Sequence, residues 1–241
     1  SVYTPPFLVR LMLEESLNWE RLDRLQERGE IILDPSCGSG VFLVEAYKRL
    51  VLHWRSRNQW QKPDVAVLKG LLKYVHGIDH EEGAIELAAF SLCLALCDAL
   101  EPETIRATIK LFPPLAGETL HLSCFFEAKE QGLITAPIGV VVGNPPFASK
   151  LTTPGAVRSY ERYNATHSTL PDKQLAYLFL HEAMEMVAEG GVLSMLQQYN
   201  FLYNQQSISL RRSFIRKWDV REILDAMLHP DGQEPQKPVS A

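Results

Sequence analysis

The sequence predicts one α/β domain built on a mostly parallel β-sheet with helices on both faces. Short apolar runs alternate along the chain with longer segments whose apolar residues have helical spacing. This alternation is typical of βαβ units, whose parallel sheets are covered on both sides. The chain has 241 residues and 46% hydrophobic content, which suits a single domain with a sizeable core.

The first elements follow from apolar spacing and from the turn residues around it. A threonine and two prolines precede a helical pattern, so a helix is expected over residues 8–17. A buried strand over residues 30–33 ends in an aspartate and a proline, and a glycine-rich turn then opens a helix over residues 41–55. A polar stretch separates these from a second strand at 75–78 and a strongly apolar helix at 84–100.

The middle of the chain continues the alternation. A third strand is expected at residues 120–122 and a fourth at 139–142, where proline stops it. Residues 152–172 are polar and rich in turn formers, which predicts a long loop. A helix over residues 174–188, closed by two glycines, leads to a fifth strand at 192–196.

The last elements are a helix over residues 205–218 and a sixth strand over residues 220–224. From residue 230 the chain has proline, glycine and glutamine without periodicity. We therefore expect a catalytic domain over residues 1–229 and an irregular tail over residues 230–241. Because the first residue is serine, we also expect the chain to be part of a longer protein.

The composition indicates the cellular environment of the protein and the classes of partner that it can bind. Four cysteines in a chain of this length indicate a reduced, cytoplasmic protein, and no apolar run is long enough for a membrane span. Residues 1–10 lack a basic start followed by an apolar stretch, so a signal peptide is not expected there. The net charge of −5 counts against nucleic-acid binding through this segment alone but does not exclude it. Two basic clusters, each an ordinary solvated surface or a contact surface, are Lys150, Arg158, Arg162, Lys173 and Arg211, Arg212, Arg216, Lys217.

The loop at residues 34–40 (DPSCGSG) joins the first strand to a helix. Its glycines permit close backbone approach, and the helix start offers free N–H groups to an anion. Asp34 would repel a phosphate, and no Gly-Lys-Ser/Thr follows, so a phosphate loop does not fit. A ligand with both a carboxylate and cations fits better, and S-adenosylmethionine has a carboxylate, an ammonium and a sulfonium.

Asp79 ends the second strand. In nucleotide-binding α/β folds an acid here accepts hydrogen bonds from both ribose hydroxyls, which suits an adenosine ligand. The alternative is that Asp79 only caps the helix that follows. Its place one βα unit after the glycine loop favours the ribose role.

The tetrad Asn144-Pro145-Pro146-Phe147 follows the fourth strand. The Asn144 side-chain carbonyl and the Pro145 main-chain carbonyl can accept the two N–H bonds of an amine whose lone pair is delocalised into a ring. Proline stiffens the segment, and Phe147 offers a ring for stacking a base. The tetrad therefore predicts positioning and electrostatic stabilisation during amine methylation, and a base in duplex DNA would have to be flipped out.

Together these motifs resemble the gamma-type adenine-N6 DNA methyltransferases of restriction-modification systems, especially the fused restriction-modification enzymes. The order is that of the gamma type: an N-terminal cofactor motif at Tyr3-Thr4-Pro5-Pro6, the cofactor loop, and then the catalytic tetrad. The resemblance implies a Rossmann-like S-adenosylmethionine-dependent methyltransferase fold that methylates adenine in DNA. It implies cofactor binding by Tyr3, Thr4, Pro5, Asp34, Pro35, Cys37, Gly38, Gly40, Phe42, Asp79, His80, Ser123 and Cys124, and catalysis by Asn144, Pro145, Pro146 and Phe147.

The chain departs from the family pattern in two places. The family has an acid after the third strand, where this chain has Ser123, with Glu118 as a rival alignment. The family also continues into a final strand and a target-recognition domain, so we expect double-stranded DNA to be recognised by a region outside this chain. The resemblance therefore implies DNA as the partner of this chain, and no membrane partner is expected. No metal is expected either, because Cys93 and Cys97 have no partner pair at metal-binding spacing and are expected to pack in the core.

Two other functions remain open. Methylation of a protein glutamine amide or of an amine in ribosomal RNA would use the same tetrad. A non-catalytic S-adenosylmethionine-binding module of a larger defence protein is the other alternative, and Ser123 together with the acidic balance motivates it.

Overall fold

A computed structural model of the chain describes residues 4–224, apart from residues 109, 148–149, 168–169 and 171–174. Within these residues, five parallel strands form one sheet in the order β3-β2-β1-β4-β5. They are β1 (Ile31–Asp34), β2 (Val75–Asp79), β3 (Leu120–Leu122), β4 (Ile138–Gly143) and β5 (Val187–Met195). The strand order reverses beside β1, and the crevice outside the carboxyl ends at such a switch point is where open α/β sheets bind ligands.

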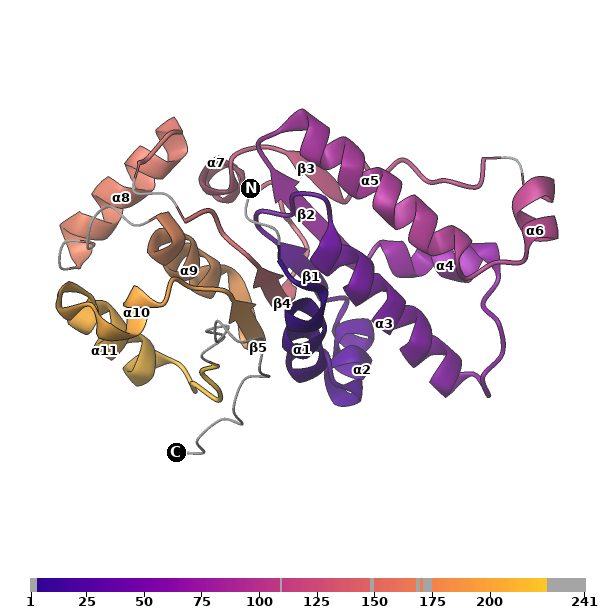
Figure 1. Cartoon of the computed structure of the whole chain (residues 1–241), viewed down its shortest axis with the longest axis horizontal. Coiled ribbons are helices and arrows are strands. Elements are labelled where there is room, and N and C mark those ends of the chain that lie inside the picture. The colour runs from indigo at the N-terminus through magenta and orange to yellow at the C-terminus, as the bar shows by residue number, and fades with distance from the viewer. Residues whose placement is uncertain (1–3, 109, 148–149, 168–169, 171–174, 225–241) are drawn as a thin grey trace, which may run out of the picture.

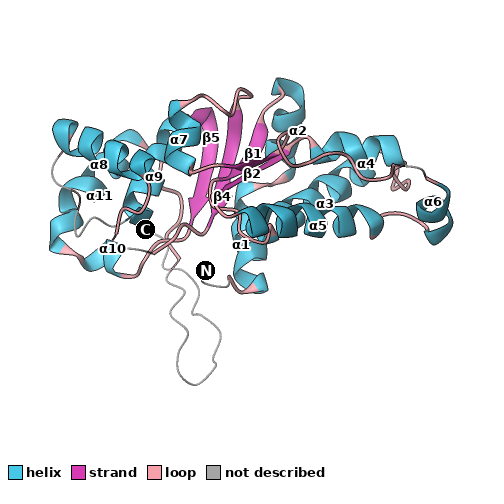
Figure 2. Cartoon of the chain, turned by 90° about the horizontal axis from the view of Figure 1, so that it is seen from above, coloured by secondary structure: helices cyan, strands magenta, loops and turns pink. Residues whose placement is uncertain are grey.

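Helices cover both faces of the sheet, as Figure 2 shows from above. The described helices are α1 (Pro6–Ser16), α2 (Trp19–Arg28), α3 (Val41–Arg57), α4 (Val65–Leu72), α5 (Glu82–Cys97), α6 (Pro102–Ala107), α7 (Phe125–Glu130), α8 (Pro154–Thr166), α9 (Leu175–Met186), α10 (Asn200–Tyr203) and α11 (Ile208–Lys217), with a 3-10 turn η2 (Gln205–Ser207) before α11. In the described part of the chain, no helix is both long and apolar enough to span a membrane.

Two apolar cores lie on the two sides of the sheet. Ile32 of β1 belongs to the core shared with α1, α3 and α5, whereas its neighbours Ile31 and Leu33 belong to the core shared with α7 and α9. Successive side chains of a strand point to opposite faces, so a strand covered on both sides must be apolar throughout. The predicted fold class, a mostly parallel sheet with helices on both faces, is confirmed.

The helix α2 was not predicted from the sequence. Its N-terminus is capped by Asn18, whose side chain accepts a hydrogen bond from the Arg21 N–H at 2.9 Å, and Gly29 ends it in the left-handed conformation. Leu22 and Leu25 are its buried residues. Because only these two leucines mark the buried face, the many charged residues of α2 gave no clear helical spacing of apolar residues.

The prediction of a loop over residues 152–172 was wrong, because residues 154–166 form α8. Thr153 caps this helix by accepting from the Ala156 N–H at 3.2 Å, and Pro154 occupies its first turn. Gly155 packs so closely on α7 that an added Cβ would lie 2.5 Å from Glu127. Packing on α7 therefore stabilises a helix whose polar composition suggested a loop.

The boundary predicted at Gly190-Gly191 was also wrong. The helix α9 ends at Met186, and β5 begins at once, so both glycines lie inside the strand. The register of β5 against β4 shifts between Ile138 and Val140, which is where the extra residues bulge out. Gly191 permits this irregularity, since an added Cβ would lie 2.7 Å from the Gly139 carbonyl oxygen.

The sixth strand predicted over residues 220–224 is absent from the described part of the chain, where these residues have no strand structure and are exposed. A segment that alternates apolar and polar residues forms a strand only where the edge of a sheet offers it free backbone hydrogen-bonding groups. On β5, the carbonyl of Gly190 instead accepts hydrogen bonds from Arg21 and Arg24 at 2.7 and 2.8 Å. The tail predicted from residue 230 lies outside the described residues.

Candidate active site

Asp34, the last residue of β1, is a buried carboxylate at the carboxyl edge of the sheet. It is 1% exposed, and its Oδ1 accepts a hydrogen bond from the Ser36 N–H at 3.0 Å. Burial raises the pKa of Asp34 to about 7, the Ser36 N–H opposes this, and the charge of Asp79 adds to it. No cationic side chain of the described residues pairs with it, so the site holds an acid that a ligand cation would stabilise.

The loop between Asp34 and α3 depends on glycine at two positions. Gly38 and Gly40 have φ angles of +51° and +81°, which side chains rarely adopt. Gly40 lies against α5, where an added Cβ would be 3.1 Å from Ala88. The space beside Gly38 is open, because an added Cβ there would meet nothing within 4 Å. The loop thus packs on α5 at Gly40 and borders open space at Gly38.

Asp79 connects the loops that follow β1 and β2. One carboxylate oxygen accepts from the Gly38 N–H at 2.9 Å, and the other accepts from the Glu81 N–H at 3.0 Å. The main-chain carbonyl of Asp79 also accepts from the Ser123 N–H at 2.9 Å, which attaches the end of β3. Asp79 therefore connects the ends of three strands by hydrogen bonds, and each of its carboxylate oxygens keeps a further lone pair for a ribose hydroxyl.

Asn144 follows β4 and contacts two other predicted motifs. Its side-chain Nδ2 donates to the Thr4 hydroxyl at 3.0 Å, and its main-chain carbonyl accepts from the Ser36 hydroxyl at 3.3 Å. The N-terminal motif, the cofactor loop and the catalytic tetrad are thus joined by side-chain hydrogen bonds, although they are far apart in sequence. Because Nδ2 donates to Thr4, the amide presents its carbonyl oxygen as the remaining acceptor.

The remaining residues of the tetrad become more exposed from Pro145 to Phe147. Pro145 is buried, Pro146 is exposed, and the Phe147 side chain is 37% exposed. A buried proline fixes the direction of the chain after Asn144, while a partly exposed ring can stack on a planar ligand. The roles of Pro145 and Phe147 in binding a base stay predictions.

Some predicted cofactor residues do not reach this edge with their side chains. Cys37 and Phe42 are 3% and 2% exposed and belong to the apolar core under the loop. The Cys37 sulfur packs over β2, where an added Cβ on Gly77 would lie 2.9 Å from it. Only main-chain atoms of these two residues can contribute to a ligand site. Tyr3 lies outside the described residues.

Of the candidate residues around the third strand, some lie at the carboxyl edge of the sheet and one lies at the opposite end. Ser123 follows β3 at the same edge as Asp34 and donates its hydroxyl to the Cys124 carbonyl at 3.2 Å, while the Cys124 sulfur lies 3.0 Å from the Thr153 hydroxyl. Glu118 precedes β3 and is exposed, so it lies at the opposite end of the strand. This argues against Glu118 in the role of the family acid. His80 is exposed, 3.6 Å from Asp79.

Sequence reasoning missed two residues that shape the site. Ser36 is one, since its hydroxyl and N–H bond to the tetrad and to Asp34. Gly143 is the other: an added Cβ would lie 2.7 Å from the Asp34 carboxylate. A glycine directly before a tetrad that ends a buried strand is the signal that would have indicated this close approach.

A family comparison agrees with this geometry. The model of the N-6 DNA Methylase family matches residues 1–227. The chain belongs to that family. Among curated relatives, it is 25% identical over 226 residues to the type II methyltransferase M.BstVI of Geobacillus stearothermophilus, covering 93% of the chain and 38% of the relative. It is 32% identical over 173 residues to the adenine-specific methyltransferase PglX of Streptomyces coelicolor, covering 60% of the chain and 14% of PglX.

Solved structures share the fold. A nuclease-deletion mutant of the Type ISP restriction-modification enzyme LlaGI, in complex with a DNA substrate mimic, aligns with a TM-score of 0.63 at 18% identity, covering 88% of this chain and 19% of that one. The type IIG restriction endonuclease BpuSI aligns with a TM-score of 0.59 at 21% identity, covering 88% and 22%. The chain thus has the methyltransferase fold and spans well under half the length of these proteins.

Proposed function

We propose that the chain is the catalytic domain of a DNA adenine-N6 methyltransferase of a restriction-modification system, with S-adenosylmethionine as its methyl donor. The observation that carries this proposal is the hydrogen bond from Asn144 to Thr4, together with that from Ser36 to the Asn144 carbonyl. These contacts bring Asn144 directly beside the loop after β1, and this proximity supports a tetrad that binds an amine next to a cofactor carrying both positive and negative charges.

The residues at the edge fit S-adenosylmethionine. Asp34 is a buried carboxylate without a cationic partner among the described side chains, which suits the ammonium of the methionine moiety. Asp79 has carboxylate lone pairs for ribose hydroxyls, and the open space beside Gly38 leaves room for the ligand. When bound, the cofactor supplies a methyl group already activated by its sulfonium.

The tetrad prepares the acceptor amine. The Asn144 side-chain carbonyl and the Pro145 main-chain carbonyl accept the two N–H bonds of the adenine amine and favour a nitrogen whose lone pair is available. As positive charge develops on that nitrogen, the same two carbonyl dipoles stabilise it. Phe147 stacks on the flipped base and keeps its ring aligned.

The deciding experiment is Asn144→Ala in the full-length protein, with methyl transfer to duplex DNA as the readout. We expect the rate to fall by about 100- to 1,000-fold, the usual consequence of removing one group that stabilises a transition state. Binding of S-adenosylmethionine, measured by calorimetry, should stay near the wild-type value. Unchanged turnover would contradict the role of the tetrad.

The same assays separate the alternative functions. Methyl transfer to RNA or to protein, but not to DNA, would favour one of the other amine substrates. No binding of S-adenosylmethionine by the full-length protein would favour a non-catalytic module, in line with Ser123 replacing the family acid.

A further inference from the structure

The charged side chains of the segment that follows β5 are all basic. Residues 190–218 contain four basic residues, Arg211, Arg212, Arg216 and Lys217, and no aspartate or glutamate, although the whole chain has a net charge of −5. The four lie on α11. A local positive surface on an acidic protein is unlike its surroundings and attracts an anionic partner.

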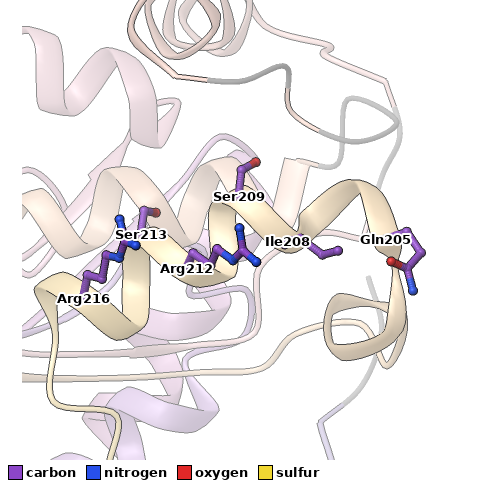
Figure 3. A pocket seen from close by; sticks show the side chains of 6 residues that line it. All are labelled: Gln205, Ile208, Ser209, Arg212, Ser213 and Arg216. Atoms are coloured by element: carbon purple, nitrogen blue, oxygen red, sulfur yellow. The ribbon is translucent and has the colours of Figure 1, made fainter.

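A groove runs along α11 and contains two of these arginines. It has a volume of about 490 Å³ and is lined by Gln205, Ile208, Ser209, Arg212, Ser213 and Arg216, which Figure 3 shows in sequence along the helix. Arg212 and Arg216 are one helical turn apart, so their guanidinium groups serve the same face. Ser213 beside them already donates its hydroxyl to the Leu210 carbonyl at 2.7 Å, so the two guanidinium groups are the charged donors of that face.

These two arginines differ from the comparable pair on α8. There, Arg158 and Arg162 are also four residues apart, but both bond to Glu130, at 2.6 and 2.5 Å, and hold the pKa of that carboxyl at about 2. In contrast, Arg212 and Arg216 form no ion pair or hydrogen bond with any described residue. Within the part of the chain that the structure describes, α11 therefore presents two guanidinium groups that no carboxylate pairs with.

The neighbouring Arg211 fixes the groove in place. Its Nη1 donates to the main-chain carbonyls of Phe201 and Asn204 at 2.5 and 2.9 Å, which attaches α11 to α10. Phe201 packs on Tyr177 and Phe214, with ring centroids 5.3 and 6.0 Å away. The groove is thus part of a packed scaffold.

The groove is connected to the tetrad through the sheet. Met195 of β5 pairs with Gly143 of β4, and the Leu196 N–H donates to the Gly143 carbonyl at 3.1 Å, directly before Asn144. From there the chain passes through α10 into Gln205 at the end of the groove. In Figure 1, α10 and α11 lie together on one side of the sheet, and α6 lies at the far opposite end.

We propose that the α11 groove binds the phosphate backbone of the DNA whose adenine enters the tetrad, with Arg212 and Arg216 each contacting a phosphate. This inference rests on the proposed function and adds a DNA contact within the chain itself, besides the recognition region expected outside it. Guanidinium groups bind phosphates through paired N–H donors, and such contacts position DNA without reading its sequence.

The test is the double variant Arg212→Gln and Arg216→Gln in the full-length protein. Binding to a fluorescent duplex is followed by anisotropy over a series of salt concentrations. Losing two phosphate contacts should reduce the magnitude of the slope of log K against log salt by about 2 and weaken binding roughly 10- to 100-fold at low salt. The loss should be equal for duplexes with and without the methylated site.

A matched control removes two charges at the far end of the molecule, by Arg106→Gln and Lys110→Gln, both exposed. The control should bind DNA like the wild type, and both double variants should keep the wild-type unfolding temperature and affinity for S-adenosylmethionine. A wild-type salt slope in the α11 variant overturns the proposal. So does a lowered unfolding temperature with DNA binding retained, since the groove would then be an internal contact of the protein.

Failure of the proposed function gives a different result. If the wild type binds DNA in an α11-dependent way but does not methylate it, the groove stands and the methyltransferase assignment fails. If methyl transfer to DNA requires Asn144 while the α11 variant has an unchanged KM for DNA and an unchanged salt slope, the assignment stands and the groove is overturned.

Discussion

Two regions at the carboxyl edge of the same sheet differ in how they are built. The loops after β1 and β4 are held inward: Asp34 is buried, Ser36 donates to Asn144, and Gly143 lies against the Asp34 carboxylate. The segment after β5 is built outward, with Arg212 and Arg216 in an open groove. The inner region, formed by the loops after β1 and β4, can hold a ligand in one geometry. The outer region, formed by the α11 groove, can attract and position a charged nucleic-acid backbone. The two proposals therefore assign catalysis and DNA attachment to segments that follow different strands of the sheet.

The largest effect expected in the inner region is on the pH dependence of stability. The pKa of Asp34 is raised from 3.8 to about 7 in the fold, mainly by burial. Between these pH values the folded state binds more protons than the unfolded state, so the free energy of unfolding falls as pH rises, by up to about 1.4 kcal/mol per pH unit. Above pH 7 this contribution is flat.

Asp34→Asn should remove this dependence, because an amide cannot ionise but can still accept from the Ser36 N–H. The measurement is urea unfolding of wild type and variant, without cofactor, at several pH values from 4 to 8. Asp98→Asn, at an exposed position, is the control and should follow the wild type. Parallel profiles for wild type and Asp34→Asn would show that Asp34 is solvated, and the contrast between the two regions would be lost.

A smaller effect is expected from the contact between Thr4 and Asn144. Thr4→Val keeps the shape of the side chain but removes the hydroxyl that accepts from Nδ2 at 3.0 Å. An amide no longer held in one orientation should lower kcat for methyl transfer by about tenfold, in proportion to one hydrogen bond of about 1 kcal/mol or slightly more. The affinity for S-adenosylmethionine should stay near wild type.

Thr4→Ser is the matched variant, since it restores the hydroxyl and should restore most of kcat. If Thr4→Val instead weakens cofactor binding and leaves kcat intact, Thr4 is a cofactor residue, as the sequence predicted, and not a positioning residue for the tetrad.

The sequence predicted the inner region far better than the outer one. The aspartates, glycines and prolines at the ends of β1, β2 and β4 are constrained by backbone geometry, so their types and spacing carry the information. The Thr4 to Asn144 contact depends on segments far apart in sequence, and only the fold brings them together. The helix α8 was missed for a similar reason, because its packing on α7 outweighs its polar composition.

The two arginine pairs show the same limit most clearly, because charge spacing alone does not reveal a counter-charge on another element. Arg158 and Arg162 look like Arg212 and Arg216 in sequence, yet Glu130 of α7 neutralises the first pair only. The double variant Arg158→Gln and Arg162→Gln should therefore leave the salt slope of DNA binding unchanged. It should leave the unfolding free energy almost unchanged, because these arginines are exposed and such ion pairs contribute little to stability.

Anisotropy and urea unfolding on the same preparation would measure both quantities. A salt slope reduced as much as that of the α11 variant would mean that DNA competes with Glu130 for the α8 arginines. The phosphate-binding surface would then extend over both helices, and a missing counter-charge would no longer be what separates a binding arginine from a structural one.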